Sequence, residues 1–235
     1  MKKLHWLLLS PLLLGYQPTT VSTRTPRNDK DLVAYYPFQG NAHDESNNQN
    51  HGIVYEASLS SDGLGRPGSA YAFNGRGSHI LVPTHPSLNV AQEITITAWI
   101  KPISTWGQYI VHKAATAGGG GPYSLDIYSG TIRVLLYGVN NGFLELSGTR
   151  PIRRDVWQHI AMTYDGKMTR LYYNGEPDGA AETTGRIDTS NKGLEIGTYL
   201  WGQPTPYYEG TIDNVRIYKR ALDASEIVSL FEEYR

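Results

Sequence analysis

The 235-residue sequence contains no cysteine. Disulfide frameworks, thiolate zinc sites, iron–sulfur clusters and a cysteine nucleophile are therefore excluded. An excess of basic charge is also lacking, because 21 lysine and arginine residues are balanced by 22 acidic residues, for a net charge of −1. Without a basic surface that neutralises phosphates, nucleic acid is not expected as a partner.

Several catalytic motifs are missing as well. The sequence contains neither the Gly-x-Ser-x-Gly of a nucleophile elbow nor the His-Glu-x-x-His of a zinc hydrolase. The glycine run 118–121 is not followed by the Lys-Ser/Thr of a phosphate-binding loop, so we interpret it as a flexible surface loop. Asp126, Glu145 and Glu195 are isolated acids between apolar neighbours, and we interpret them as outward polar residues.

Long hydrophobic runs are absent, and the longest, Trp6–Leu14, is about half of the ~20 residues that span a bilayer. It follows Lys2 and Lys3, which predicts a signal peptide over residues 1–17 with cleavage near residues 16–24. Tyr16 stands where a lipoprotein cleavage box requires cysteine, so no lipid anchor is expected. We predict a secreted protein, periplasmic or extracellular, with an uncleaved apolar start as the alternative.

The sequence is rich in turn formers and tyrosine, with 25 glycines, 13 prolines and 17 tyrosines. After a disordered leader predicted at 18–30, residues 31–235 consist of short alternating runs that are typical of antiparallel strands. Asn174-Gly175 predicts a hairpin turn. We predict an all-β fold, a two-sheet antiparallel β-sandwich. The predicted strands are 32–38, 51–55, 70–73, 79–82, 93–101, 108–113, 123–128, 131–137, 143–146, 157–164, 169–173, 193–197 and 211–218.

The carboxyl-terminal segment has a different pattern. Asp223-Ala224-Ser225-Glu226 forms a capping box, in which the first and last side chains satisfy each other's backbone. Ile227, Leu230 and Phe231 then follow at helical spacing, which predicts a short helix that docks on the sandwich.

Five segments in order carry a resemblance to a known family. The first reads AYYPFQGNAHDESNNQNHG, and the others are Ile94–Pro102, Trp157–Gly166, Leu171–Gly175 and Gly210–Leu222. Residues 32–231 resemble the laminin G-like, concanavalin A-like jelly-roll domain of the lectin/glucanase superfamily, which occurs in many exported bacterial proteins. The resemblance implies a jelly-roll sandwich with a calcium ion that acts as a glycan-binding or adhesive module. The chain departs from the family's pattern at Asn214, where a second acid is frequent, and at Asn74–Ser78, which replaces an acid-rich turn.

The resemblance implies a structural Ca²⁺ site at Asn41, Asp44 and Asp213. Calcium prefers oxygen ligands, and the loop 40–52 is dense in Asn, Asp and Gly. Asp213 has the parity of Val215, so its carboxylate would begin on the inward side if Val215 faces the core. Alternatively, Asn41 and Asp44 only cap a turn, and Asp213 pairs with an arginine such as Arg216 or Arg76.

Two groups of aromatic residues lie in loops rich in glycine and proline. Such rings stack on sugars while nearby polar groups bond the hydroxyls. Burial that anchors the loops is the alternative. The predicted ligand-binding residues are Trp106, Tyr123 and Tyr137 around the glycine run, and Trp201, Tyr207 and Tyr208 in the second loop.

These observations predict a secreted, non-catalytic, lectin-like module that binds a polysaccharide or surface glycan. A hydrolase of the same fold would carry paired carboxylates in a Glu-x-Asp-x-x-Glu run, which is absent. The alternatives are an extracellular protein-binding adhesion module, and a glycan-active hydrolase or lyase of the same fold.

Overall fold

The structure is a computed structural model that describes residues 29–115, 120–200 and 206–234. The predicted signal peptide, nearly all of the predicted leader and Trp201 lie outside the described residues. The described elements are β1 (Leu32–Tyr36), β2 (Ile53–Tyr55), β3 (Ser58–Ser60), β4 (Ala70–Asn74), β5 (His79–Val82), the 3-10 helix η2 (Pro86–Leu88), β6 (Ile94–Pro102), β7 (Gln108–Lys113), β8 (Tyr123–Tyr128), β9 (Thr131–Tyr137), β10 (Phe143–Ser147), β11 (Gln158–Tyr164), β12 (Met168–Tyr173), β13 (Glu176–Glu182), β14 (Leu194–Ile196), β15 (Glu209–Tyr218) and α1 (Ala224–Glu232).

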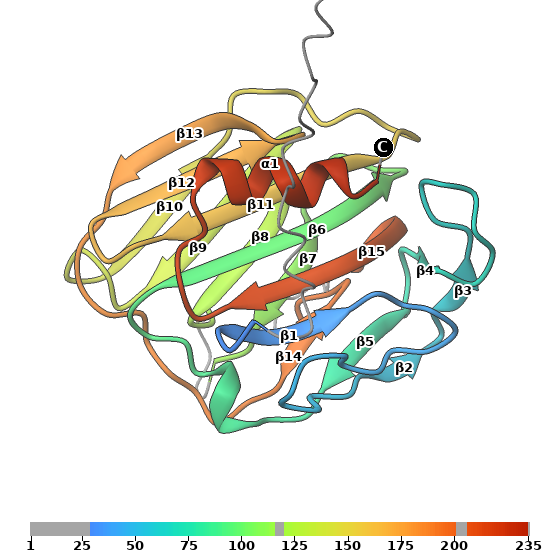
Figure 1. Cartoon of the computed structure of the whole chain (residues 1–235), viewed down its shortest axis with the longest axis horizontal. Coiled ribbons are helices and arrows are strands. Elements are labelled where there is room, and N and C mark those ends of the chain that lie inside the picture. Colours follow the sequence, from blue (N-terminus) through green and yellow to red (C-terminus); the bar gives the residue numbers. More distant parts are fainter. Residues whose placement is uncertain (1–28, 116–119, 201–205, 235) are drawn as a thin grey trace, which may run out of the picture.

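The strands form two antiparallel sheets that pack face to face (Figure 1). The first sheet has the order β13-β12-β11-β6-β15-β4-β3, and β1 pairs with β15 in addition. The second sheet has the order β10-β9-β8-β7-β14-β5-β2. Apolar side chains of both sheets fill the space between them, including Ile96, Ile110 and Ile217. The predicted two-sheet β-sandwich is confirmed.

The strand β6 shows why the sequence folds this way. Ile94, Ile96, Ala98 and Ile100 alternate into the core, as the pattern predicts. The opposite face of β6 is also buried, because Trp99 stacks on Phe231 of α1 at 5.7 Å and on Tyr234 just after α1 at 5.0 Å, measured between ring centroids.

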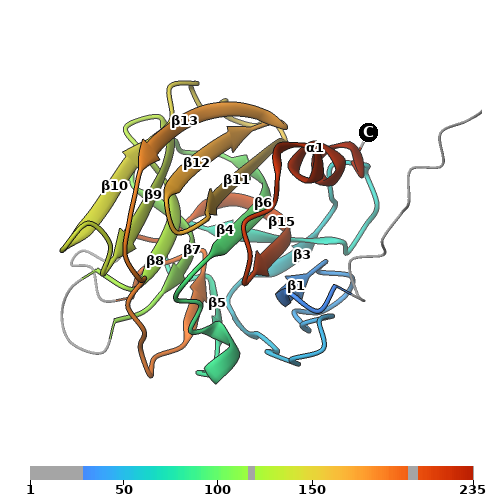
Figure 2. The same ribbon diagram turned by 60° about the vertical axis from the view of Figure 1, so that its left-hand side comes forward.

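The helix α1 covers the outer face of the first sheet (Figure 2). Its predicted capping box is confirmed, since the Glu226 amide donates to Asp223 Oδ1 at 2.9 Å and the Asp223 amide donates to Glu226 Oε2 at 3.0 Å. Ile227 and Leu230 are buried against the sheet. Within the described ranges, no helix has both the length and the apolar character needed to cross a membrane.

A β-bulge in β15 changes the expected direction of Asp213. Asp213 pairs with Trp99 and Arg216 pairs with Thr97, so three steps along β15 match two along β6. Asn214 accommodates the extra residue at a φ of 47°. Asp213 is therefore on the same face as Trp99, beneath the end of α1, and the inward direction expected from its parity with Val215 is wrong.

Candidate functional site

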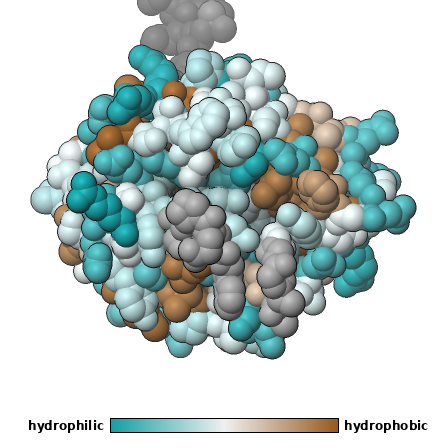
Figure 3. All heavy atoms as spheres, turned by 180° about the vertical axis from the view of Figure 1, so that it is seen from behind, coloured by the Kyte–Doolittle hydropathy of each residue, from teal (hydrophilic) through white to brown (hydrophobic). Residues whose placement is uncertain are grey.

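The outer face of the second sheet lies on the side of the molecule opposite α1 (Figure 3). Outside the grey atoms, hydrophobic side chains on this side are scattered among hydrophilic ones and do not form one continuous patch. The pairing register of the second sheet aligns the side chains of this face in rows across the strands. One row runs from Glu145 through Leu135, Ser124 and His112 to Glu195. This face therefore mixes rings, hydroxyls and charged groups.

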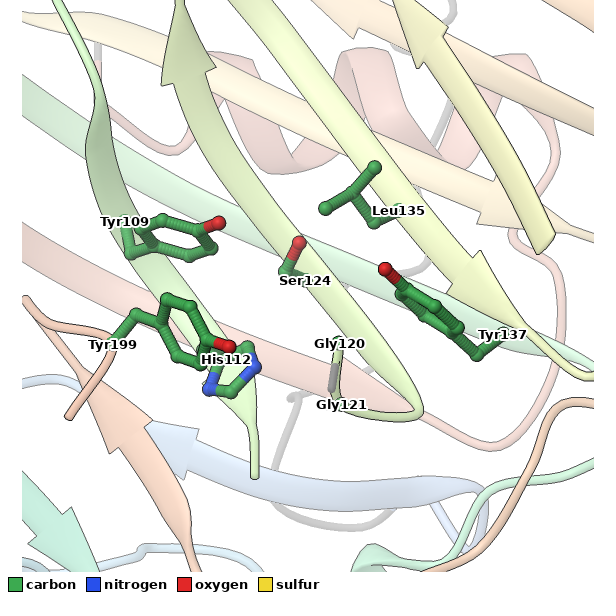
Figure 4. A pocket seen from close by; sticks show the side chains of 8 residues that line it. All are labelled: Tyr109, His112, Gly120, Gly121, Ser124, Leu135, Tyr137 and Tyr199. Atoms are coloured by element: carbon green, nitrogen blue, oxygen red, sulfur yellow. The ribbon is translucent and has the colours of Figure 1, made fainter. Parts of the chain in front are cut away.

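A pocket of about 130 Å³ opens at the centre of this face. Figure 4 shows Tyr109, His112 and Tyr199 on one side of it and Tyr137 on the other, with Ser124 and Leu135 between them. The strands β7, β8 and β9 supply most of these side chains, so the regular sheet fixes their spacing. The pocket is smaller than the roughly 300–1,000 Å³ of sites for drug-sized ligands, which suits one small group such as a sugar ring.

Two glycines form the remaining wall of the pocket. An ideal Cβ at Gly120 would lie 2.0 Å from the Tyr137 ring, and one at Gly121 would lie 1.6 Å from the carbonyl oxygen of Lys113. A side chain at Gly121 would therefore collide with backbone, and one at Gly120 would push the Tyr137 ring away. The end of the glycine run is required for this wall to pack against the strands.

A carboxylate on the neighbouring strand holds His112 in place. Its Nδ1 lies 3.0 Å from Glu195 Oε2, and both side chains are buried. The carboxylate accepts, so in the neutral ring the proton is on Nδ1 and Nε2 is an acceptor. An ideal Cβ at Gly121 would lie 2.8 Å from Nε2, which places this nitrogen at the glycine wall of the pocket.

The row of side chains next to His112 contains a buried ion pair. Arg133 Nε donates to Asp126 Oδ1 at 2.8 Å, and Nη1 of the same guanidinium donates to Glu145 Oε1 at 3.3 Å. Burial raises the pKa of Asp126 to about 6, and the charge of Arg133 opposes this shift. Ser124 Oγ donates to Asp126 Oδ2 at 3.1 Å, so Asp126 lies directly beside a pocket residue on the same strand.

Aromatic rings continue the surface beyond both ends of the pocket. At one end, the Arg133 guanidinium lies 4.1 Å from the ring centroid of Tyr128. The Tyr128 ring in turn stacks with Trp106, with 5.9 Å between the centroids. At the other end, Tyr137 stacks with Phe143 at 5.4 Å. Trp106 and Phe143 are the outermost rings of this strip and are 69% and 55% exposed. We call the pocket and these rings the aromatic face.

The predicted ligand-binding residues have different positions in the structure. Trp106 and Tyr137 belong to the aromatic face, whereas Tyr207 lies elsewhere, near His79, with 6.1 Å between the ring centroids. The predictions for Tyr123 and Tyr208 are corrected: both rings are fully buried in the core. Their hydroxyls donate to the carbonyl oxygens of Leu88 and Thr211, at 2.9 and 3.4 Å.

The sequence did not assign the polar residues of the pocket and its surroundings to a ligand site. His112 and Glu195 are far apart in the chain and meet only because β7 pairs with β14. Glu195 and Asp126 were expected as outward polar residues, and they do point out of the core, but they are buried beneath other side chains of that face. The alternation of Ser124, Asp126 and Tyr128 along β8 was the local signal for a polar outer face.

The three predicted calcium ligands are engaged in hydrogen bonds with the protein. Asp44 accepts four of these, each 2.8 Å long, from the amides of Tyr35, Ser46 and Asn50 and from the Ser46 hydroxyl. Asn41 is exposed, and its Oδ1 accepts from the His43 amide at 2.8 Å. Both residues organise the loop as turn caps, as in the alternative interpretation.

Asp213 is buried and has different neighbours from those expected. Its Oδ1 accepts from the Asn214 amide at 2.6 Å, and Oδ2 accepts from the Tyr234 hydroxyl and the Asn214 side chain. Arg216 instead pairs with Glu233 at 2.6 Å. In the part of the chain that the structure describes, no three His, Asp or Glu residues are grouped so that they could hold a metal. The three residues do not fit a calcium cage as they stand, and calcium binding stays a prediction.

The sequence profile of the concanavalin A-like lectin/glucanases superfamily matches residues 74–228. The chain belongs to this superfamily. No curated protein matches the sequence.

Solved structures with this superfamily's fold resemble the chain at low sequence identity. The binding domain of Paraclostridial Mosquitocidal Protein 1 superposes with a TM-score of 0.68 at 20% identity, over 87% of this chain and 52% of that one. Domain 4 of AbnA, a GH43 extracellular arabinanase from Geobacillus stearothermophilus, was solved in complex with arabinotriose. It superposes with a TM-score of 0.63 at 21% identity, over 85% of this chain and 98% of that one. The botulinum neurotoxin serotype G binding domain superposes with a TM-score of 0.66 at 16% identity, over 86% of this chain and 51% of that one. The chain thus spans about half the length of the toxin domains.

Proposed function

We propose that the protein is a non-catalytic carbohydrate-binding module that holds a polysaccharide or surface glycan on the aromatic face. The observation that supports this most directly is the central pocket, where three tyrosine rings surround hydrogen-bonding groups of His112 and Ser124. Rings bury the apolar faces of sugars, and polar groups between them bond the hydroxyls. The exposed rings at either end extend the same type of surface beyond one sugar residue.

Sugar binding on this fold in other proteins supports the proposal. Domain 4 of AbnA was solved with arabinotriose, and cell entry of botulinum neurotoxin type C is dependent upon interaction with two ganglioside molecules. A protein ligand is the second candidate, since the binding domain of botulinum neurotoxin DC was solved with rat synaptotagmin II. The scattered hydrophobic side chains in Figure 3 favour a polar ligand over a flat apolar protein interface.

The test is binding of immobilised arabinan, xylan, β-glucan and chitin by wild type, Trp106→Ala and Tyr137→Ala. If these rings contact the sugar, each substitution weakens binding by about 30-fold, the ~2 kcal/mol of a recognition hot spot. Trp106→Ala changes the unfolding free energy by no more than about 0.5 kcal/mol, because the ring is exposed. Tyr55→Ala is the matched control, since that ring is 42% exposed on β2 at the opposite edge of the same sheet.

Two outcomes would contradict the proposal. Binding that Trp106→Ala and Tyr137→Ala leave unchanged would place the ligand elsewhere on the molecule. New reducing ends released from any of the four polysaccharides would show that the protein is a hydrolase.

We also propose that the protein is exported. Lys2, Lys3 and the short apolar run Trp6–Leu14 support this, because they match a signal peptide. Mass spectrometry of the protein from its native source is expected to find an amino terminus near residues 16–24. An intact terminus at Met1 or Lys2 would contradict export by cleavage.

A further inference from the structure

Two polar groups in the wall of the pocket present acceptors to a ligand. Ser124 donates its hydroxyl proton to Asp126, and Glu195 accepts the Nδ1 proton of His112. The oxygen of Ser124 and, in the neutral ring, Nε2 of His112 therefore remain as acceptors. A sugar hydroxyl donates to such groups, whereas a carboxylate or sulfate offers only acceptors.

The charges beside the pocket favour the same ligand. Asp126 is buried next to Ser124 on β8, Glu195 is buried next to His112 on β14, and Glu145 on β10 pairs with Leu135 at the other side of the pocket. Among the described residues that line the pocket, none is a lysine or an arginine. Residues 116–119 and 201–205, which the structure does not describe and which come next to Gly120 and soon after Tyr199 in the sequence, contain no ionisable side chain.

Arg133 lies next to the pocket and already has carboxylate partners. It donates to both Asp126 and Glu145, and its guanidinium covers the ring of Tyr128. When His112 is neutral, Asp126, Glu145 and Glu195 outnumber this arginine on the outer face of the sheet. A buried guanidinium that already has two carboxylate partners gains little from a third.

Resting on the proposed function, we propose that the pocket selects an uncharged, hydroxyl-bearing sugar residue and rejects one that carries a carboxylate or sulfate. Hydrogen-bond polarity and charge both favour this choice. An anionic sugar would bring its charge close to two buried carboxylates, and at Ser124 and His112 its acidic group would find acceptors where it needs donors.

The experiment compares matched pairs of oligosaccharides by calorimetry at pH 7.5, where Asp126 is ionised. The pairs are galactotriose against trigalacturonic acid and lactose against 3′-sialyllactose. The neutral member is expected to bind at least tenfold more tightly in 20 mM salt. The ratio should narrow in 500 mM salt, because salt screens the part of the repulsion that passes through solvent.

A charge reversal at the rim gives a second test. Glu145 is on β10, and its side chain is 45% exposed, so Glu145→Lys can be accommodated without burying a new charge. This variant is expected to reduce the preference for the neutral member at least threefold. Glu232→Lys on α1 makes the same charge change over the opposite sheet and should leave the preference unchanged.

The outcomes separate this inference from the proposed function. If the acidic member binds as tightly as the neutral one, and Tyr137→Ala weakens both, the aromatic face binds glycans but the inference is overturned. If a neutral preference exists but Glu145→Lys and Glu232→Lys reduce it equally, the preference reflects net charge and the inference is also overturned. If no member of either pair binds and none of the four polysaccharides does, the proposed function fails and the inference fails with it.

Discussion

Asp44 fixes the first loop through hydrogen bonds that reach both β1 and the loop itself. Three of its four donors are backbone amides, and the residue is buried. Removing the carboxylate leaves these amides without their partner, which costs about 1–3 kcal/mol for each buried group that stays unpaired. Asp44→Ala is therefore expected to lower the unfolding free energy by at least about 2 kcal/mol in chemical denaturation.

The same variant tests the calcium prediction. Because the protein's own donors satisfy Asp44, the loss should be equal in calcium and in chelator. Asn41→Ala is the control, as its exposed side chain should change the unfolding free energy by less than about 0.5 kcal/mol. A loss that disappears in chelator would show instead that Asp44 acts through a bound ion.

Lys113 is a buried cation without a carboxylate partner in the described structure. Its ammonium donates to the carbonyl of Lys192 and to the carbonyl and hydroxyl of Ser190, at 3.4 and 3.2 Å for the latter two. Burial lowers the pKa of Lys113 from 10.5 to about 8. Between these values the unfolded chain binds more protons than the folded chain, so stability rises with pH.

This shift predicts a measurable pH dependence. From pH 8 to pH 9.5 the unfolding free energy of wild type should rise relative to that of Lys113→Met, by at most about 1.4 kcal/mol per pH unit. Denaturant titrations at matched pH values provide the measurement. Parallel curves for the two proteins would show that the ammonium does not lose its proton more readily in the folded state.

At the scale of elements, the local patterns predicted most strands and their turns. The bounds of β7, β8 and β9 are those expected, and Asn174 and Gly175 adopt the positive φ angles of 50° and 80° that their hairpin turn needs. The strand β13 was missed because its sequence, EPDGAAE, contains residues that are depleted in strands. It forms because the turn before it brings it alongside β12.

Long-range pairing explains what the sequence could not indicate about the site. The loop aromatics suggested a ligand surface, but Tyr123 and Tyr208 turn inward where their strands join the core. The contact of His112 with Glu195 depends on the pairing of β7 with β14, and the direction of Asp213 depends on a bulge. Neither feature has a local sequence pattern of its own.

At the scale of the whole molecule, the two outer faces differ in what covers them. The first sheet carries α1, and Trp99 is buried beneath its end. The second sheet carries the aromatic face, whose outermost ring, Trp106, is exposed. The molecule thus uses one face to complete its hydrophobic burial, and the other is available for a ligand.

The central place of β15 in the first sheet also affects how the chain folds during synthesis. On one edge β15 pairs with β4 through residues 209–212 and with β1 through residues 215–218, while its other edge pairs with β6. A nascent chain on the ribosome therefore presents β1, β4 and β6 without the strand that joins them until nearly the whole domain has been translated. Their open edges are available for mispairing during this interval, so the first sheet closes late.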